Sequence, residues 1–303
     1  MTLLRSLLFT PGNNEHMMRK TGTLEADAVI LDLEDAVPMA EKGTARDLVR
    51  DSIQPVASGG SRVFVRINAL STGLAAGDLR GTVQSGLAGV VLPKTEAADD
   101  VIQVSEWISE LEYRQGLTSE SLALIPLLET SRGILSANDI ATASRRIIAV
   151  AFGRLDFSRD MGISLSKEGQ EILYAMSHVA LVARAAGVTA IDSPCVEFRD
   201  LNRLQCEAQR ARQLGFRGKL LIHPCQIEWV HRVFSPSDEE LAYAQKVKEA
   251  FESAEARGLG AVSLEGTMID IASLRQAEEV LSWAEAIRSR CGDSQPERKS
   301  TEA

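Results

Sequence analysis

Apolar runs recur along the chain at intervals, and each one ends in polar residues. They read as continuous hydrophobic segments and not as alternating ones, which is typical of parallel strands that are covered on both faces. We therefore predict eight strands, at residues 3–9, 28–35, 62–68, 89–94, 122–130, 146–153, 188–193 and 219–224.

Amphipathic stretches of helical length separate these runs, for example residues 96–115 and residues 166–187, the second of which ends at Gly187. Strand and helix alternating eight times predicts an α/β fold, either a (β/α)8 TIM barrel or a doubly wound open sheet. Polar residues at the ends of nearly every strand favour the barrel. The length of 303 residues suits one barrel of about 250 residues with an appendage.

The character of the chain changes after Pro224 to charged helix. Ser235 or Ser237 is a good N-cap ahead of an acidic first turn, and Gly258 is a good stop signal. We expect a barrel with the metal site at residues 1–228, a C-terminal helical region at residues 229–290, and a disordered polar tail at residues 291–303.

The composition argues against several classes of binding partner. The net charge of −9 argues against nucleic acid and against an anionic membrane, because both select clustered positive charge. No apolar run approaches the ~20 residues that cross a bilayer, so we expect a soluble, cytoplasmic protein. The four cysteines form no CxxC pair and suggest neither a zinc site nor a disulfide framework.

Candidate chemistry lies where the strands end, because catalytic groups of barrel enzymes sit at the carboxyl ends of the strands. The polar residues at those positions are Asp32, Glu34, Asp35, Arg66, Asn68, Lys94, Glu129, Asp156, Asp192 and His223.

Glu129 and Asp156 follow successive strands, which would place two carboxylates side by side in the barrel mouth. Two hard oxygen ligands without cysteine suit Mg2+, which retains water and accepts oxygens from a substrate. The alternative is that each carboxylate caps a helix or pairs with an arginine such as Arg132 or Arg154.

The cationic strand-end residues have two interpretations each. Arg66 could hold a carboxylate or an enolate oxygen, or could form a salt bridge with Glu34 or Asp35. Lys94 could form a Schiff base with a keto substrate, or could be a solvated residue. His223 could be a general base or a ligand, although a lone histidine before proline is more often a hydrogen-bonded structural residue.

Many segments in order match one family over residues 5–277. They are RSLLFTPGNNEHM, DAVILDLEDAV followed by Lys42, Ala45 and Arg46, FVRIN, GVVLPKTE, IPLLET, FGRLDF with DMG, GFRGKLLIHPCQI, FSPSDEE and GTMIDIASLRQA. The sequence resembles the HpcH/HpaI-type CoA-ester lyases, a group that includes the citrate lyase β subunit, malyl-CoA lyase and citramalyl-CoA lyase.

The resemblance implies a barrel with a C-terminal helical lid, assembled as a homotrimer or hexamer. It implies that Glu129 and Asp156 hold Mg2+, and that Arg66 is catalytic and binds the acid part of a CoA thioester. Asp270 would be the acid/base carboxylate, which the lid delivers to a neighbouring subunit. Without the resemblance, Asp270 reads as a helix N-cap.

The resemblance also implies a set of residues that bind the substrate and CoA. Those residues are Phe9, His16, Lys20, Asp32, Glu34, Asp35, Arg66, Ile222 and His223.

The implied reaction is a retro-Claisen cleavage that gives a keto acid and the enolate of acetyl-CoA. Many family members carry an acidic residue where this chain has Leu155, and Asn where it has Cys225. These departures resemble a subgroup that includes citramalyl-CoA lyases, so we expect (S)-citramalyl-CoA to give pyruvate and acetyl-CoA. The alternatives are a malyl-CoA or citryl thioester lyase (a citrate lyase β subunit), a malyl-CoA thioesterase, and a Schiff-base aldolase using Lys94.

Overall fold

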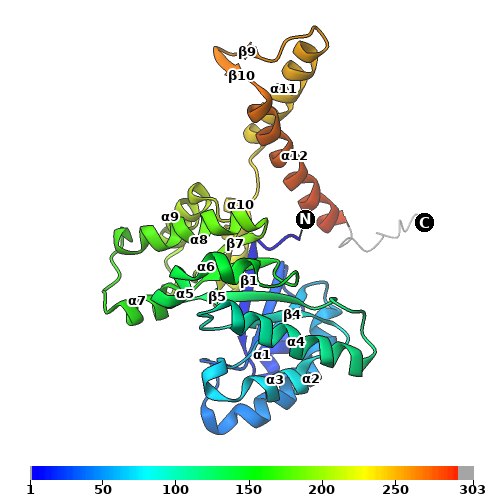
Figure 1. The fold of residues 1–303 in the computed structure, drawn as a ribbon, viewed down its shortest axis with the longest axis vertical. Helices are drawn as coiled ribbons and strands as arrows, with labels where there is room; N and C mark the ends of the chain where they lie inside the picture. Colours follow the sequence, from blue (N-terminus) through cyan, green and yellow to red (C-terminus); the bar gives the residue numbers. More distant parts are fainter. Residues whose placement is uncertain (1, 293–303) are drawn as a thin grey trace, which may run out of the picture. The chain divides into compact units, whose positions relative to one another are not determined.

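Eight parallel strands close into a barrel in the computed structural model, which describes residues 2–292 (Figure 1). The strands pair in chain order, and β1 closes the ring against β8. The predicted (β/α)8 barrel is confirmed. The strands are β1 (Ser6–Pro11), β2 (Ala28–Asp32), β3 (Arg62–Arg66), β4 (Leu87–Leu92), β5 (Ala123–Leu128), β6 (Ala149–Phe152), β7 (Thr189–Asp192) and β8 (Gly218–Leu221).

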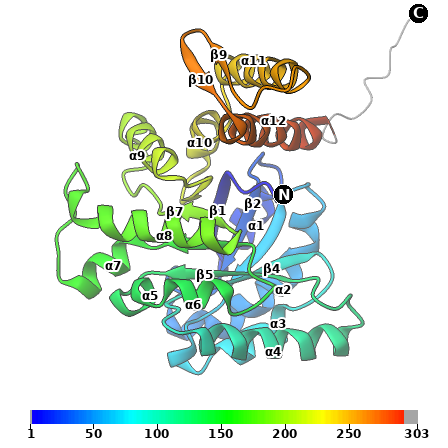
Figure 2. The same cartoon turned by 45° about the horizontal axis from the view of Figure 1, so that its top comes forward.

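Helices connect the strands and surround the barrel (Figure 2). The α-helices of this unit are α1 (Glu15–Thr21), α2 (Lys42–Ala57), α3 (Ala75–Thr82), α4 (Ala98–Gln115), α5 (Ser131–Leu135), α6 (Ala137–Thr142), α7 (Arg154–Met161), α8 (Leu173–Ala186), α9 (Leu201–Leu214) and α10 (Ile227–Phe234). Short 3-10 turns are η1 (Met39–Glu41), η2 (Leu70–Thr72), η3 (Gln170–Ile172) and η4 (Pro224–Gln226). Across residues 2–292, no helix combines the length and the apolar character that a membrane span needs.

Alternate strand residues face opposite sides of the barrel wall, as the two-residue period of a strand requires. On β2, Ile30 packs with the side chains that fill the barrel interior, whereas Val29 and Leu31 pack with those that meet the helices. On β3, Phe64 is inside and Val63 is outside. Both faces are therefore buried, which explains why the strands read as continuous apolar runs.

Every strand except β1 ends earlier than its apolar run suggests, whereas β1 continues to Pro11. The run at residues 28–35 is a strand only to Asp32, because the Asp32 carboxylate accepts the backbone N–H groups of Glu34 at 2.9 Å and of Ala36 at 3.1 Å. Such local bonds from an aspartate fold the backbone into a turn. The expected helix at residues 166–187 begins only at Leu173 and ends at Gly187, whose φ of 71° suits glycine.

A second unit begins at Ser235, six residues after the start expected at residue 229, because α10 belongs to the barrel unit. It contains α11 (Asp238–Glu255), the hairpin β9 (Val262–Leu264) and β10 (Thr267–Ile269), and α12 (Ile271–Gly292). Ser237 caps α11 in a reciprocal pair with Glu240. Of the tail expected at residues 291–303, residues 293–303 lie outside the described residues.

Closure of the barrel depends on a glycine at the start of β8. A Cβ atom on Gly218 would lie 1.8 Å from the carbonyl oxygen of Leu4. We predict that Gly218→Ala destabilises the protein by about 3 kcal/mol, because β8 must move away from the segment before β1.

Urea denaturation measures this change. The matched control is Gly43→Ala in α2, where an added Cβ meets nothing within 4 Å, and which should be neutral or stabilise by about 0.5–1 kcal/mol. Equal effects of the two substitutions would contradict the closure argument.

Candidate active site

The centre of the site is a buried ion pair between neighbouring strands. Asp32 ends β2 and Arg66 ends β3, and the strand register places them opposite each other. The alternation along each strand turns both side chains to the inner face. Arg66 donates from Nε to Asp32 Oδ1 at 2.7 Å and from Nη2 to Oδ2 at 2.6 Å. This two-point contact fixes the guanidinium plane at the mouth of the barrel.

Glu34 extends the pair into a network. Its Oε2 atom lies 2.9 Å from Arg66 Nη1, and its Oε1 atom accepts from the Lys94 ammonium group. Asp35 is more exposed and lies 3.9 Å from Arg66 and 3.5 Å from Lys94. Thus the salt-bridge alternative for Arg66 is realised, and Lys94 is engaged by carboxylates.

The charge states in this network follow from burial and pairing. Burial by itself would raise the pKa of Asp32, but the charge and hydrogen bonds of Arg66 hold that pKa below its usual value. Burial raises the pKa of Glu34. Burial opposes the charge on Arg66, yet Asp32 and Glu34 keep its pKa above the usual value. Arg66 is therefore a fixed cation, with the ring of Phe9 stacked 4.6 Å from its Cζ atom.

Glu129 enters the same space from the end of β5, where it is only 2% exposed. A Cβ atom on Gly153 would lie 2.5 Å from Glu129 Oε2, so glycine at the end of β6 makes room for this carboxylate. Its Oε1 atom accepts the Lys94 N–H at 2.8 Å. Lys94 has a φ of 49°, a conformation that costs energy in a residue with a Cβ atom and places the amide toward Glu129.

Glu129 is a poorly compensated carboxylate. Burial, followed by the charges of Glu34 and Asp156, raises its pKa to about 8. Asp156 lies in the first turn of α7 and pairs with Arg159. Glu34 Oε2 is buried and accepts no hydrogen bond from the described residues. A divalent cation near Glu129 and Asp156 would offset this repulsion with the oxygen ligands that Mg2+ prefers.

Few side chains are available here to bind a metal ion. Within residues 2–292 no group of three or more His, Cys, Asp or Glu side chains is arranged to hold a metal ion. Two carboxylates nevertheless suit Mg2+, which usually keeps several waters and takes further oxygens from its substrate. The residues present therefore fit the predicted cofactor.

Among the described residues, the other predicted site residues of the barrel unit form no hydrogen bond or ion pair with this network. His16 and Lys20 are exposed on α1, and Ile222 is exposed after β8. His223 stacks on Phe198 with ring centres 4.7 Å apart and accepts the Cys225 N–H at 3.2 Å. His223 thus caps η4, which is the structural alternative.

Asp270 belongs to the second unit and caps α12. Its Oδ1 atom accepts from the N–H groups of Ala272 and Ser273, each at 3.0 Å, and from the Ser273 hydroxyl at 3.1 Å. The hydrogen bonds from Ser273 hold the pKa of Asp270 below its usual value. The capping interpretation is therefore correct locally, and Oδ2 accepts none of these bonds.

Two other strand-end residues make structural contacts and do not face this site. Asn68 donates to Asp78 at 2.7 Å, and Asp192 faces outward to contact Lys219. One residue with a role at the site was missed as a side chain of interest, namely Lys42, which donates to the carbonyl oxygens of Leu33 and Glu34 at 2.6 Å. Its sequence signal was its place after LEDAV in a segment that matches the family.

Comparisons with known proteins show the family to which this chain is similar. The family model HpcH/HpaI aldolase/citrate lyase matches residues 5–224. The chain is 37% identical over 284 residues to the citrate lyase subunit beta of Leuconostoc mesenteroides subsp. cremoris, covering 94% of each. It is 32% identical to the human mitochondrial citramalyl-CoA lyase, covering 94% of this chain and 87% of the human protein.

A solved structure has a similar fold. The CitE protein of Mycobacterium tuberculosis in complex with magnesium, acetoacetate and coenzyme A has a TM-score of 0.75 and 32% identity, covering 93% of this chain and 98% of CitE. The chain belongs to the HpcH/HpaI aldolase/citrate lyase family. The predictions of the family and of a lyase are confirmed, and magnesium in the CitE complexes supports Mg2+ as the cofactor.

The raised pKa of Glu129 predicts how stability without metal depends on pH. The folded state holds this proton more tightly than the unfolded chain, so stability falls as pH rises from about 4.5 through about 8. Glu129→Gln keeps the shape and removes the charge. With EDTA present, we predict that the variant gains roughly 2 kcal/mol over wild type between pH 6 and pH 8.5.

Thermal and urea unfolding across this pH range measure the difference. Glu110→Gln, an exposed change on α4, is the control and should follow the wild-type profile. A Glu129→Gln curve parallel to wild type would show that Glu129 ionises normally in the fold.

Proposed function

We propose that this protein is an Mg2+-dependent carbon–carbon lyase that cleaves (S)-citramalyl-CoA into pyruvate and acetyl-CoA. One observation carries the proposal: a fixed guanidinium and a pair of crowded carboxylates lie in the same barrel mouth. Arg66 matches the charge of a keto acid, and Glu129 with Asp156 suits a cation that binds oxygens of the substrate. Relatives with lyase names over nearly the full chain support the same reaction class.

The protein residues have separate tasks in this scheme. Glu129 and Asp156 would hold Mg2+, which when bound supplies Lewis acidity to the oxygens of the substrate. Arg66, held flat by Asp32 and Phe9, would bind the carboxylate of the substrate without reorganising. Glu34 and Asp35 would border the waters of the site.

Asp270 would move the proton at the carbon that becomes the methyl group of acetyl-CoA. Its pKa is held low by Ser273, which favours the carboxylate and suits proton removal in the condensation direction. In the cleavage direction the proton of the substrate hydroxyl would pass to water as the carbon–carbon bond breaks. Protonated Asp270 would give its proton to the enolate carbon and take up another from water. We propose that the second unit acts as a lid on a neighbouring subunit within a cytoplasmic homotrimer or hexamer.

Substrate choice is argued from the residue beside Asp156. Leu155 is 45% exposed on α7 and presents an apolar surface there. This suits the methyl group of citramalyl-CoA better than the additional carboxylate of a citryl thioester. His16 and Lys20, exposed on α1, with Ile222 and His223, would contact the CoA portion.

A product assay tests the reaction. Purified protein is incubated with citramalyl-CoA, malyl-CoA and citryl-CoA, with Mg2+ or with EDTA, and the products are identified by mass spectrometry. We predict acetyl-CoA and pyruvate from citramalyl-CoA at the highest rate, with loss of at least 100-fold in EDTA.

Other products would select the alternatives. Free CoA with intact hydroxy acid would indicate a thioesterase. Turnover of citryl or malyl thioesters in preference would assign the other lyases, and borohydride trapping at Lys94 would indicate a Schiff-base aldolase. No turnover of any ester would contradict an independently active lyase.

A complementation experiment tests the role of Asp270 between subunits. Asp270→Asn and Glu129→Gln should each lose most activity, because each lacks one half of the site. Co-expressed and isolated as mixed oligomers, they should recover a substantial fraction, since an intact Asp270 can then serve an intact barrel. Asp238→Asn, an exposed change on α11, is the control. Mixed oligomers as inactive as their parents would contradict delivery between subunits.

A further inference from the structure

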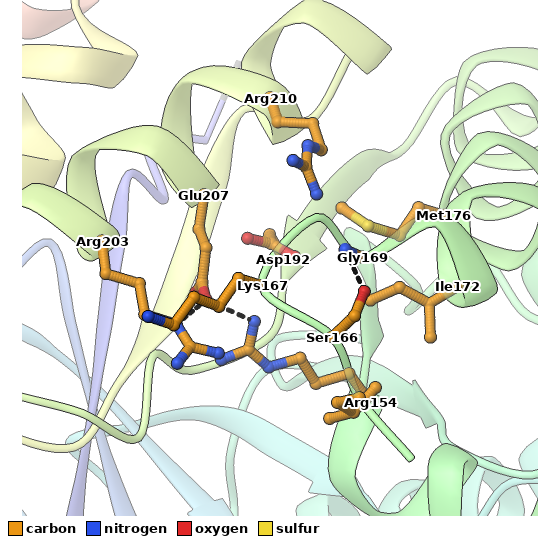
Figure 3. Close-up of a pocket in the computed structure, with 11 residues that line it drawn as sticks. Arg154, Ser166, Lys167, Gly169, Ile172, Met176, Asp192, Arg203, Glu207 and Arg210 are labelled. Carbon is orange, nitrogen blue, oxygen red and sulfur yellow. Dashed lines mark hydrogen bonds and ion pairs between the residues drawn. The ribbon is translucent and has the colours of Figure 1, made fainter. Parts of the chain in front are cut away.

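A second polar hollow lies outside the barrel wall, on the side opposite to the inward-facing residues of the mouth. It lies between the ends of β6 and β7, the segment before α8, and α9 (Figure 3). Its lining residues are Arg154, Leu165, Ser166, Lys167, Gly169, Ile172, Met176, Asp192, Arg203, Glu207 and Arg210.

The acidic residues of this hollow are already neutralised. Asp192 pairs with Lys219, its in-register neighbour on β8. Glu207 on α9 receives Arg154 at 2.8 Å and Arg203 at 3.0 Å, and Lys219 lies 3.7 Å away. These contacts hold both carboxylates in place. The buried Oε2 atom of Glu207 accepts no hydrogen bond from the described residues, and Lys219 Nζ lies 3.7 Å from it.

Cationic capacity remains after this pairing. Arg154 is only 8% exposed, and its Nε–H group is buried without an acceptor among the described residues. Arg210 and Lys167 form no ion pair within 4 Å in the described part of the chain. The pKa of the exposed Glu171 is lowered first by a hydrogen bond from its own backbone, then by those from Ser166, and to a smaller extent by the charge of Arg210. Arg203 is shared between Glu207 and Glu197.

The cations surround the hollow from different elements. Figure 3 shows Arg210 extending from α9 toward Asp192 and Gly169, while Arg154 and Arg203 meet at Glu207. Gly169 has a φ of 59°, and a Cβ atom there would lie 2.7 Å from Arg210 Nη1. The absence of a side chain at Gly169 thus lets the Arg210 guanidinium lie close to this bend. The Gly169 N–H donates a hydrogen bond to the Ser166 hydroxyl there.

We propose that this hollow is a binding site for a phosphate-sized dianion, separate from the barrel mouth. Three segments supply positively charged hydrogen-bond donors. These are the unused Nε–H of Arg154, the guanidinium of Arg210 and the ammonium of Lys167. Guanidinium groups bind phosphate oxygens through paired hydrogen bonds, and a dianion would offset the excess of positive charge. The ligand is inorganic phosphate or the phosphate group of a small monoester.

Binding is measured by isothermal titration calorimetry on the full chain, with inorganic phosphate and with glycerol phosphate, at constant ionic strength. We predict saturable binding of one anion per chain. Arg210→Gln and Lys167→Gln should each weaken it roughly tenfold. Lys167 is exposed, so its substitution keeps the test valid if Arg210→Gln misfolds. Tighter binding of one anion identifies the source of the phosphate group.

Two control variants locate the site. Arg80→Gln, an exposed change on α3, and Lys20→Gln, on the face proposed for CoA, should leave phosphate affinity unchanged. Binding that is lost in Lys20→Gln and kept in Arg210→Gln would overturn the proposal. So would heats no larger than those of chloride.

Discussion

The site depends on one buried ion pair, between Asp32 and Arg66, which the strand register creates. Adjacent parallel strands end at the same level, and the two-residue period turns both side chains inward. A buried charge is tolerated only when it is paired and hydrogen-bonded. Arg66 also forms an ion pair with Glu34, and Glu34 in turn forms an ion pair with Lys94. A series of ion pairs thus orders the mouth of the barrel, and the register of β2 and β3 places the first pair.

Glu129 is the member that this network does not neutralise. Its carboxylate accepts the Lys94 amide N–H. The charges of Glu34 and Asp156 raise its pKa, and the charge of Arg66 opposes them only in part. Crowding of this kind costs stability, and proteins keep it where function requires it. A divalent cation bound there would convert the repulsion into binding free energy. The stability that the fold gives up at Glu129 would then be available to a metal and to the substrate that shares it.

The sequence predicted the barrel well, because continuous apolar runs and strand-end polar residues are local signals. It also predicted Glu129 and Asp156 as a pair, since both follow successive strands. It could not separate the inward Asp32 from the outward Asp192, because both end apolar runs and only strand phase distinguishes them. Asp270 had no signal beyond a helix cap, and its proposed role came from the family resemblance alone.

We propose that Glu129 and Asp156 form a divalent cation site in the barrel mouth. Mn2+, a paramagnetic substitute for Mg2+, allows this to be measured directly by electron paramagnetic resonance, without substrate. We predict one bound Mn2+ per chain that Mg2+ displaces, and loss of that binding in Asp156→Asn. Undiminished Mn2+ binding in Asp156→Asn, or none in the wild-type protein, would contradict the account.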